Sequence, residues 1–186
     1  MPFLIWVRDT VCPDILAAGR AAGLGDAGGP PLLVLDPISG IPAPPSELEI
    51  ELVTTPDGVV DHASTLRDGF GLPAEVVDRL IDPALLDQPD AGVFVGRVDG
   101  RPVSCSLLVT SGPTAGVYNV ATLGALRGKG YGAALTWAAV AEGARRGCTH
   151  AVLQSSESGY PVYRRMGFTD LGRYAQLQGP PRASAA

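Results

Sequence analysis

The sequence predicts an α/β domain with a mixed sheet, and three observations favour this fold class. Two β-rich runs are joined by Asp99-Gly100, which is a strong signal for an antiparallel hairpin. A third strand leads into the glycine-rich stretch LRGKGYGAAL at residues 126–135, which opens an apolar helix. After that helix, two further strand patterns flank a short helix. Strands and helices therefore interleave along most of the chain, as they do in α/β domains.

Residues 1–46 are predicted to form an accessory strand–helix–strand segment that ends in a proline-rich linker. FLIWV is rich in strand formers, and Pro13 and Asp14 begin the helix PDILAAGRAAGLG. PLLVLD is a second apolar strand. The stretch PISGIPAPPSE then carries four prolines and a glycine between two patterned regions. We therefore place the domain boundary near residue 46.

Residues 47–178 are predicted to form the main domain. LEIELV alternates as a strand, and DGVVDHASTLRDGFG and PAEVVDRLID are two helices, the second with Pro73 in its first turn. Three strands follow within residues 91–123, and a helix spans about 130 to 146 with Gly147 beyond its end. The strand HAVLQ, the short helix YPVYRRM and the strand FTDLGRYAQLQ complete the domain. Residues 179–186 are expected to form a disordered tail.

Composition and charge exclude several classes of protein. The net charge of −5 argues against nucleic acid as the main partner, because phosphate binding by counterion release favours a basic protein. No apolar run reaches the roughly 18 residues that a membrane span needs. The N-terminus lacks the basic region of a signal peptide. The chain has three cysteines without metal-ligand spacing: Cys12, Cys105 and Cys148. We therefore expect reduced thiols, no metal site and a cytoplasmic location.

Three phosphate-binding motifs are possible for the glycine-rich stretch, of which the first fails and the second fits poorly. A Walker loop needs one more residue between Gly124 and Gly128, and a Ser or Thr where Gly130 stands. A dinucleotide fingerprint matches from Gly128 to Ala133. It also requires an acidic residue about twenty positions on, and the strand in that place contains none.

The third interpretation is a loop whose backbone N–H groups and following helix N-terminus bind a pyrophosphate. Glycine would allow the backbone to approach the phosphates closely, and some positions would need a positive φ. Arg127 and Lys129, the latter the only lysine of the chain, add positive charge at this place. An ordinary glycine-rich turn is the alternative, because 24 of the 186 residues are glycine.

Two motifs in register resemble a known family. Arg127-x-x-Gly130-x-Gly132, preceded by VYNVATL and followed by an apolar helix, resembles the acetyl-CoA-binding motif of the GNAT superfamily of N-acetyltransferases. YPVYRRMGF resembles the family's downstream segment that ends in Y-x-x-x-G-F. The resemblance covers residues 48 to about 178 and is sharpest over 118–168. It implies a GNAT acyl-CoA N-acyltransferase fold, with a mostly antiparallel mixed sheet splayed at the cofactor site and flanked by helices.

The resemblance also implies a set of cofactor-binding residues. The backbone of Val120, Ala121 and Thr122 would bind the acetyl carbonyl and the pantetheine amides of acetyl-CoA, and an amide donor there would stabilise the oxyanion of the reaction. Ser156 stands where many relatives have an Asn that contacts the cofactor, and its hydroxyl would be a partial substitute. The pyrophosphate would lie against the glycine-rich loop and its cations: Arg127, Gly128, Lys129, Gly130, Tyr131, Gly132 and Ala133.

Tyr163 falls on the family's general-acid position, where it would protonate the departing CoA thiolate. The alternative is a core aromatic on a short helix. The general base stays open, because the stretches in which several relatives carry a Glu contain no carboxylate here. His150 opens a strand and is interpreted as structural. The other candidates are Tyr118, Asn119, Glu157 and His62.

The activity that the resemblance implies is direct transfer of an acetyl group from acetyl-CoA to a primary amine through a ternary complex. No cysteine has the setting of a nucleophile, which argues against an acyl-enzyme intermediate. A non-catalytic acetyl-CoA sensor or regulatory module is the alternative, since no carboxylate base is evident. The acceptor could be a small molecule or a peptide amine. The N-terminal segment could wall the acceptor pocket, cover a sheet edge or mediate a homodimer, and Met1 could be an internal start of a longer protein.

Overall fold

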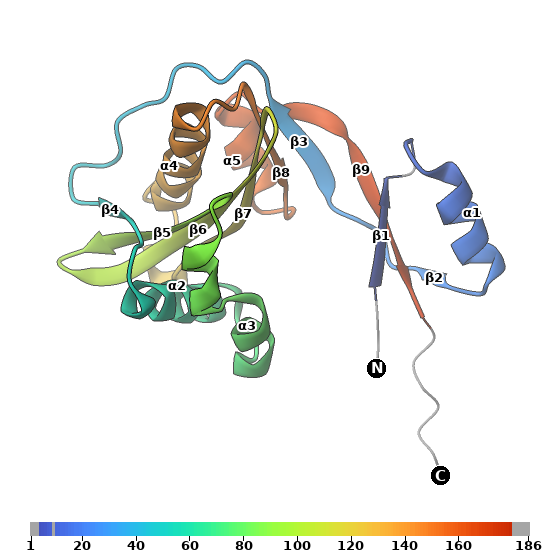
Figure 1. The fold of residues 1–186 in the computed structure, drawn as a ribbon, viewed down its shortest axis with the longest axis horizontal. Coiled ribbons are helices and arrows are strands. Elements are labelled where there is room, and N and C mark those ends of the chain that lie inside the picture. Colours follow the sequence, from blue (N-terminus) through green and yellow to red (C-terminus); the bar gives the residue numbers. More distant parts are fainter. Residues whose placement is uncertain (1–3, 9, 180–186) are drawn as a thin grey trace, which may run out of the picture. The chain divides into compact units, whose positions relative to one another are not determined.

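The computed structural model describes residues 4–8 and 10–179 and divides the chain into two compact units. The larger unit runs from Leu35 to Leu153, and the smaller one combines Met1–Val34 with Gln154–Ala186 (Figure 1). The boundary that we predicted near residue 46 therefore lies inside the larger unit. The first strands of the chain group with the last one because they pair with it.

The sheet of the larger unit is mixed and mostly antiparallel. Within the described residues its strands follow the order β8-β7-β6-β5-β4, and only β7 and β8 pair in parallel. The hairpin between β5 and β6 turns at Asp99 and Gly100, whose φ values of 49° and 73° fit the predicted tight turn. The strands are β4 (Glu49–Leu52), β5 (Ala91–Val98), β6 (Arg101–Ser111), β7 (Thr114–Thr122) and β8 (His150–Gln154).

Two long helices cover opposite faces of this sheet: α2 (Pro56–Phe70) and α4 (Tyr131–Arg145). Residues of α2 share a buried cluster with Cys105 and Leu107 of β6. On the α4 side, the Ser106 hydroxyl donates to the Leu135 carbonyl at 2.8 Å. Because successive residues of a strand point to opposite faces, these contacts place the two helices on different sides.

Shorter elements complete the larger unit. The helix α3 (Ala74–Leu80) follows α2, and Pro73 is its N-cap residue rather than part of its first turn. Two 3₁₀ turns that we did not predict are η1 (Pro83–Asp87) and η2 (Gly124–Leu126). The proline-rich stretch from 37 to 47 contains no helix or strand and lies within the larger unit.

The smaller unit is built around the last strand, β9 (Thr169–Gln178), which pairs in antiparallel fashion with β1 (Leu4–Arg8), β2 (Gly25–Asp26) and β3 (Pro31–Leu35). The helix α1 (Pro13–Ala21) packs Leu16 against Val7 and Leu177. A second helix, α5 (Tyr160–Arg165), precedes β9. The predicted strand–helix–strand order is confirmed, with β2 as an addition. The predicted tail lies outside the described residues except for residue 179.

Candidate functional site

The strand β7 has two differently paired edges. Its parallel ladder with β8 runs only from Thr114 opposite His150 to Val117 opposite Leu153. On its other edge, β7 stays paired with β6 as far as Thr122 opposite Ser104. Residues 119–122 of β7 therefore have an edge that β8 does not use, and this stretch is the free edge of β7. This geometry agrees with a sheet that is splayed beside the glycine-rich loop.

A β-bulge at Asn119 changes the direction in which β7 presents its side chains. Asn119 has a φ of +52°, and the β6–β7 register shifts between Cys105 and Leu107. Ala115, before the bulge, lies against Gly143 of α4. Val120, after the bulge, lies near Gly132 of the same helix. Regular alternation would put these two residues on opposite faces. The bulge thus turns residues 120–122 without ending the strand.

Side chains of β6 hold the bulged strand in place. The Ser104 hydroxyl donates to the Ala121 carbonyl at 2.7 Å and lies 2.9 Å from the Thr122 hydroxyl. The thiol of Cys105 donates to the Asn119 carbonyl at 3.4 Å. Burial raises the pKa of the Cys105 thiol to about 12, so the group stays neutral and is unsuited to act as a nucleophile.

The glycine-rich loop ends in an uncapped helix N-terminus. Gly128 and Gly130 have φ values of +81° and +84°, a region that favours glycine. In the described chain no side chain caps α4, whose first residue is Tyr131. A Cβ atom at Gly128 would meet no atom within 4 Å, and one at Gly130 only Pro45 at 4.0 Å. The first N–H groups of a helix have no partner within it, and here no side chain caps them, so with the helix dipole they suit an anion.

Gly132 has a different role from the other two glycines. A Cβ atom there would lie 3.3 Å from the Thr122 Oγ1 atom and 3.8 Å from Val120. The missing side chain thus lets the first turn of α4 pack closely against the end of β7. The hydroxyl of Thr136 donates to the Gly132 carbonyl at 2.9 Å and covers this turn. The loop and the free edge of β7 are consequently neighbours.

Arg127 makes contacts that the sequence did not reveal. Its Nη2 atom donates to the Gly69 carbonyl at 2.6 Å, and its Nε atom donates to the Thr122 carbonyl at 3.3 Å. Gly69 lies in the last turn of α2, where helix carbonyls lack partners within the helix. Arg127 therefore connects the end of α2 to the end of β7. The other cation of the loop, Lys129, is exposed.

Tyr131 contributes its backbone rather than its ring to the loop surface. Its side chain is 2% exposed, and its hydroxyl donates to the Glu47 Oε1 atom at 3.2 Å. Burial and the neighbouring Glu47 carboxylate raise the pKa of this phenol, so it stays protonated. The contact fixes the start of α4 to the end of the proline-rich linker.

Tyr163 and Ser156 belong to the smaller unit, whereas residues 120–122 and the loop belong to the larger one. Tyr163 lies on α5, is 9% exposed and packs edge-on against Phe168 with ring centroids 5.9 Å apart. The Ser156 hydroxyl accepts the N–H of Gly159 at 3.1 Å and thereby closes the turn before α5. Ser156 thus has a local structural role that the sequence reasoning missed.

The surroundings of the two histidines argue against either of them as the general base. His62 is fully buried on α2, and its Nδ1 atom lies 3.1 Å from the Phe94 carbonyl. Its Nε2 atom has no hydrogen-bond partner among the described residues. Burial lowers the pKa of His62, so the ring is neutral and shielded from solvent, which disfavours it as the base. His150 lies 2.8 Å from the Thr114 hydroxyl and has a structural role.

Metal chemistry has no candidate residues in the part of the chain that the structure describes. No group of three or more His, Cys, Asp or Glu side chains gathers there. The described cysteines are free thiols. No described helix has the length and apolar character to cross a bilayer. The arrangement that stands out is the free edge of β7 beside the uncapped start of α4.

The Arg127 connection predicts a difference between the two cations of the loop. Arg127→Ala should lower the free energy of unfolding by about 1 kcal/mol, because two backbone carbonyls lose a charged donor. Lys129→Ala should change it by less than about 0.5 kcal/mol, because this side chain is exposed. Urea unfolding of both variants measures the difference. Equal losses would contradict the structural role of Arg127.

The buried His62 ring predicts a pH dependence of stability. Its pKa is lower in the folded chain than the ordinary value of about 6.5 in the unfolded chain. As the pH falls below about 6.5, the unfolded chain takes up a proton that the folded chain does not, so stability decreases. His62→Gln should flatten this decrease between about pH 6.5 and 5. An unchanged slope in His62→Gln, measured by urea unfolding, would refute this account.

Several solved structures similar in fold to this chain are described as N-acetyltransferases or GNAT proteins. A GCN5-related N-acetyltransferase from Kribbella flavida superposes with a TM-score of 0.76 at 22% identity, over 96% of this chain and 68% of the other. A GCN5-related N-acetyltransferase from Sphaerobacter thermophilus gives 0.70 at 17%, over 96% and 59%. A tandem GNAT protein from the clavulanic acid biosynthesis pathway gives 0.71 at 17%, over 97% and 65%. At these identities the likeness shows the fold.

The family of the chain is shown by its match to the sequence model of a protein family. No curated protein matches the chain. The model of the acetyltransferase (GNAT) family matches residues 62–168, more than half of the chain. This match includes the bulged strand β7, the glycine-rich loop, α4 and the segment ending at Phe168. The chain therefore belongs to the GNAT acetyltransferase family.

Proposed function

We propose that this chain transfers an acetyl group from acetyl-CoA to a primary amine by direct attack in a ternary complex. The observation that carries the proposal is the uncapped N-terminus of α4 next to the free edge of β7. One element suits the pyrophosphate and the other suits an extended, amide-containing arm. Because Gly132 brings the two elements into contact, a single ligand can use both.

The residues of the loop fit the pyrophosphate of the cofactor. The backbone N–H groups from Gly128 to Ala133 would bind the phosphate oxygens, and the dipole of α4 would favour their negative charge. The Lys129 ammonium would add a mobile cation at the rim. Arg127 would act mainly by holding the loop, because its guanidinium already donates to two backbone carbonyls.

The free edge of β7 fits the pantetheine arm. The backbone groups of Val120, Ala121 and Thr122 would pair with its amides, as one strand pairs with another. When bound, acetyl-CoA supplies a thioester whose carbonyl carbon is the electrophile. A backbone N–H of this edge would donate to the carbonyl oxygen, where negative charge develops as the amine adds. The bulge at Asn119 would set the direction in which the backbone groups of residues 120–122 point.

Tyr163 would serve as the general acid. The proposal rests on its place in the segment YPVYRRMGF, and a phenolic hydroxyl is able to protonate a thiolate. Ser156 would make the contact that many relatives make with an Asn. The base remains to be found among Tyr118, Asn119 and Glu157, each of which could orient a water that accepts the amine proton.

A non-catalytic acetyl-CoA sensor is the second candidate. It is favoured by the fact that β7 and β8 carry no carboxylate and that the Ser156 hydroxyl closes its own turn. The experiment that separates the two functions is incubation with acetyl-CoA and a panel of primary amines, including a polyamine, an aminoglycoside and lysine. Release of free CoA thiol together with acetylated amine, seen by mass spectrometry, supports transfer. Binding of acetyl-CoA without transfer to any amine would support the sensor.

The role of Tyr163 predicts a separation of turnover from binding. Tyr163→Phe should lower kcat by about 100-fold, because loss of a general acid typically costs this much or more. The affinity for acetyl-CoA, measured by calorimetry, should stay unchanged. Tyr160→Phe is the matched control, because Tyr160 lies on the same helix and donates to Asp170 at 2.8 Å. An unchanged kcat in Tyr163→Phe would remove Tyr163 from the mechanism.

A further inference from the structure

The ring of Tyr118 lies over Gly116 on β7. A Cβ atom at Gly116 would be 2.7 Å from the Tyr118 Cε2 atom, 3.1 Å from Cζ and 2.9 Å from the hydroxyl oxygen. The ring therefore occupies the space that a side chain at position 116 would fill. It remains accessible, because Tyr118 is 38% exposed. The glycine thus allows an aromatic side chain to lie along the strand beside solvent.

Two valines flank the Tyr118 ring. Gly116 is opposite Val109 of β6 on one side and opposite Val152 of β8 on the other. Residues directly opposite one another in neighbouring strands point to the same face, so the ring over Gly116 lies between these two side chains. Val109 is 39% exposed, and Val152 is half-buried. We call the side chains of Val109, Tyr118 and Val152 the apolar platform.

The helix α2 covers only part of this face of the sheet. Leu107 of β6 is opposite Tyr118, and it belongs to the buried cluster that includes residues of α2. Ala121, beyond the bulge, lies against Gly69 of the same helix. The covered part of the face thus includes Leu107 and Ala121. The apolar platform begins beside them and is accessible to a ligand.

The next row of residues on this face is polar but carries no strong charge. Ser111, Thr114 and His150 are opposite one another, and the His150 Nε2 atom lies 2.8 Å from the Thr114 hydroxyl oxygen. Neither the apolar platform nor this row contains an Asp, Glu, Lys or Arg. A polycationic ligand finds no counterion among these residues, whereas an apolar group would cover valine and tyrosine carbon atoms.

The apolar platform adjoins the place where the proposed function puts the thioester. The β7–β8 ladder ends at Val117, one residue before Tyr118. The glycine-rich loop meets the other end of the free edge, because Gly132 lies close to Thr122. An extended arm that runs from the loop along this edge would bring its thioester end toward Tyr118. An acceptor that attacks the thioester would therefore lie over the apolar platform.

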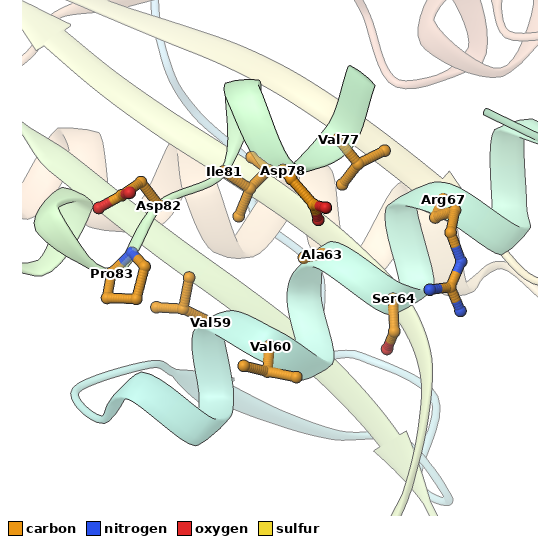
Figure 2. A pocket seen from close by; sticks show the side chains of 10 residues that line it. All are labelled: Val59, Val60, Ala63, Ser64, Arg67, Val77, Asp78, Ile81, Asp82 and Pro83. Atoms are coloured by element: carbon orange, nitrogen blue, oxygen red, sulfur yellow. The ribbon is translucent and has the colours of Figure 1, made fainter. Parts of the chain in front are cut away.

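A pocket between α2 and α3 lies elsewhere (Figure 2). Its lining comes from residues 59–83 and includes no residue of β6, β7 or β8. Its aliphatic residues Val59, Val77 and Ile81 are buried, so they offer a ligand little surface. The apolar platform, in contrast, combines accessible apolar side chains with a position next to the free edge of β7.

We propose that the apolar platform binds the body of the acceptor, and that the acceptor is a primary amine joined to a compact apolar group. This inference rests on the proposed acetyl transfer and names its class of acceptor. The apolar group would cover the Tyr118 ring and the two valines, and the amine would face the thioester carbonyl. A polyamine or an aminoglycoside gains no comparable contact. Tyr118 is then a specificity-determining residue.

The first test measures binding alone, with three primary amines: 2-phenylethylamine, ethylamine and 1,4-diaminobutane. Each is titrated into the full chain, with and without CoA, after ¹³C labelling of the valine methyl groups and the tyrosine rings. Shifts at Val109, Tyr118 and Val152 locate the ligand, and Tyr118→Phe identifies the Tyr118 signal by removing it. The affinity for 2-phenylethylamine should be at least about tenfold higher than for the other two amines.

Variants then test the ring and its position. Tyr118→Ala should weaken the binding of 2-phenylethylamine by about tenfold, and Tyr118→Phe should retain it. Gly116→Ala should weaken it by about threefold, because the added Cβ atom would displace the ring. In the Tyr118→Ala background, Gly116→Ala should have no further effect. A loss that persists in that background would overturn the role assigned to the ring.

The binding and transfer results separate this inference from the proposed function. Equal affinities for the three amines, or no shifts at the apolar platform, would overturn the inference. Acetyl transfer without a preference for 2-phenylethylamine over 1,4-diaminobutane would overturn it as well and leave the proposed function intact. Binding of 2-phenylethylamine at the apolar platform without acetyl transfer to any amine would support the apolar platform as a binding site and contradict the proposed transfer.

Discussion

The early end of the β7–β8 pairing is the constraint on which the rest of the site depends. Backbone N–H and C=O groups need partners, and a strand edge without a neighbour is exposed to any extended molecule that offers them. Here the ladder stops at Val117, so β8 does not pair with residues 119–122, which lie beside the uncapped start of α4. The two elements are neighbours, and under our proposal one ligand with amides and a pyrophosphate would bind to both.

Three side-chain contacts hold this open arrangement. Ser104 binds the bulged part of β7, Arg127 joins the end of that strand to the last turn of α2, and Tyr131 joins the start of α4 to Glu47. Each contact joins segments that are distant in the sequence, and each involves a side chain whose polar atoms are engaged within the protein. Ser104 and Tyr131 are buried, whereas Arg127 is exposed although its guanidinium binds two backbone carbonyls.

The sequence was a good guide to local structure and a poor one to long-range contacts. The turn at Asp99-Gly100 and the helix after the glycine-rich loop follow from turn chemistry and apolar periodicity, which are local properties. The contact of Arg127 with Gly69 spans 58 residues, and no periodicity reveals it. The grouping of the first strands with β9 depends on strand pairing across most of the chain. The fully buried state of His62 depends on how α2 packs, which its own helix pattern does not determine.

The central claim is that the open backbone at the start of α4 binds the pyrophosphate of coenzyme A. Calorimetric titration with acetyl-CoA and with S-acetylpantetheine, which lacks the pyrophosphate and the nucleotide, tests this claim most directly. The account predicts that acetyl-CoA binds with micromolar affinity and at least about tenfold more tightly than S-acetylpantetheine, because the loop N–H groups and the helix dipole act on the phosphates. Equal affinities, or no binding of acetyl-CoA at millimolar concentration, would contradict it.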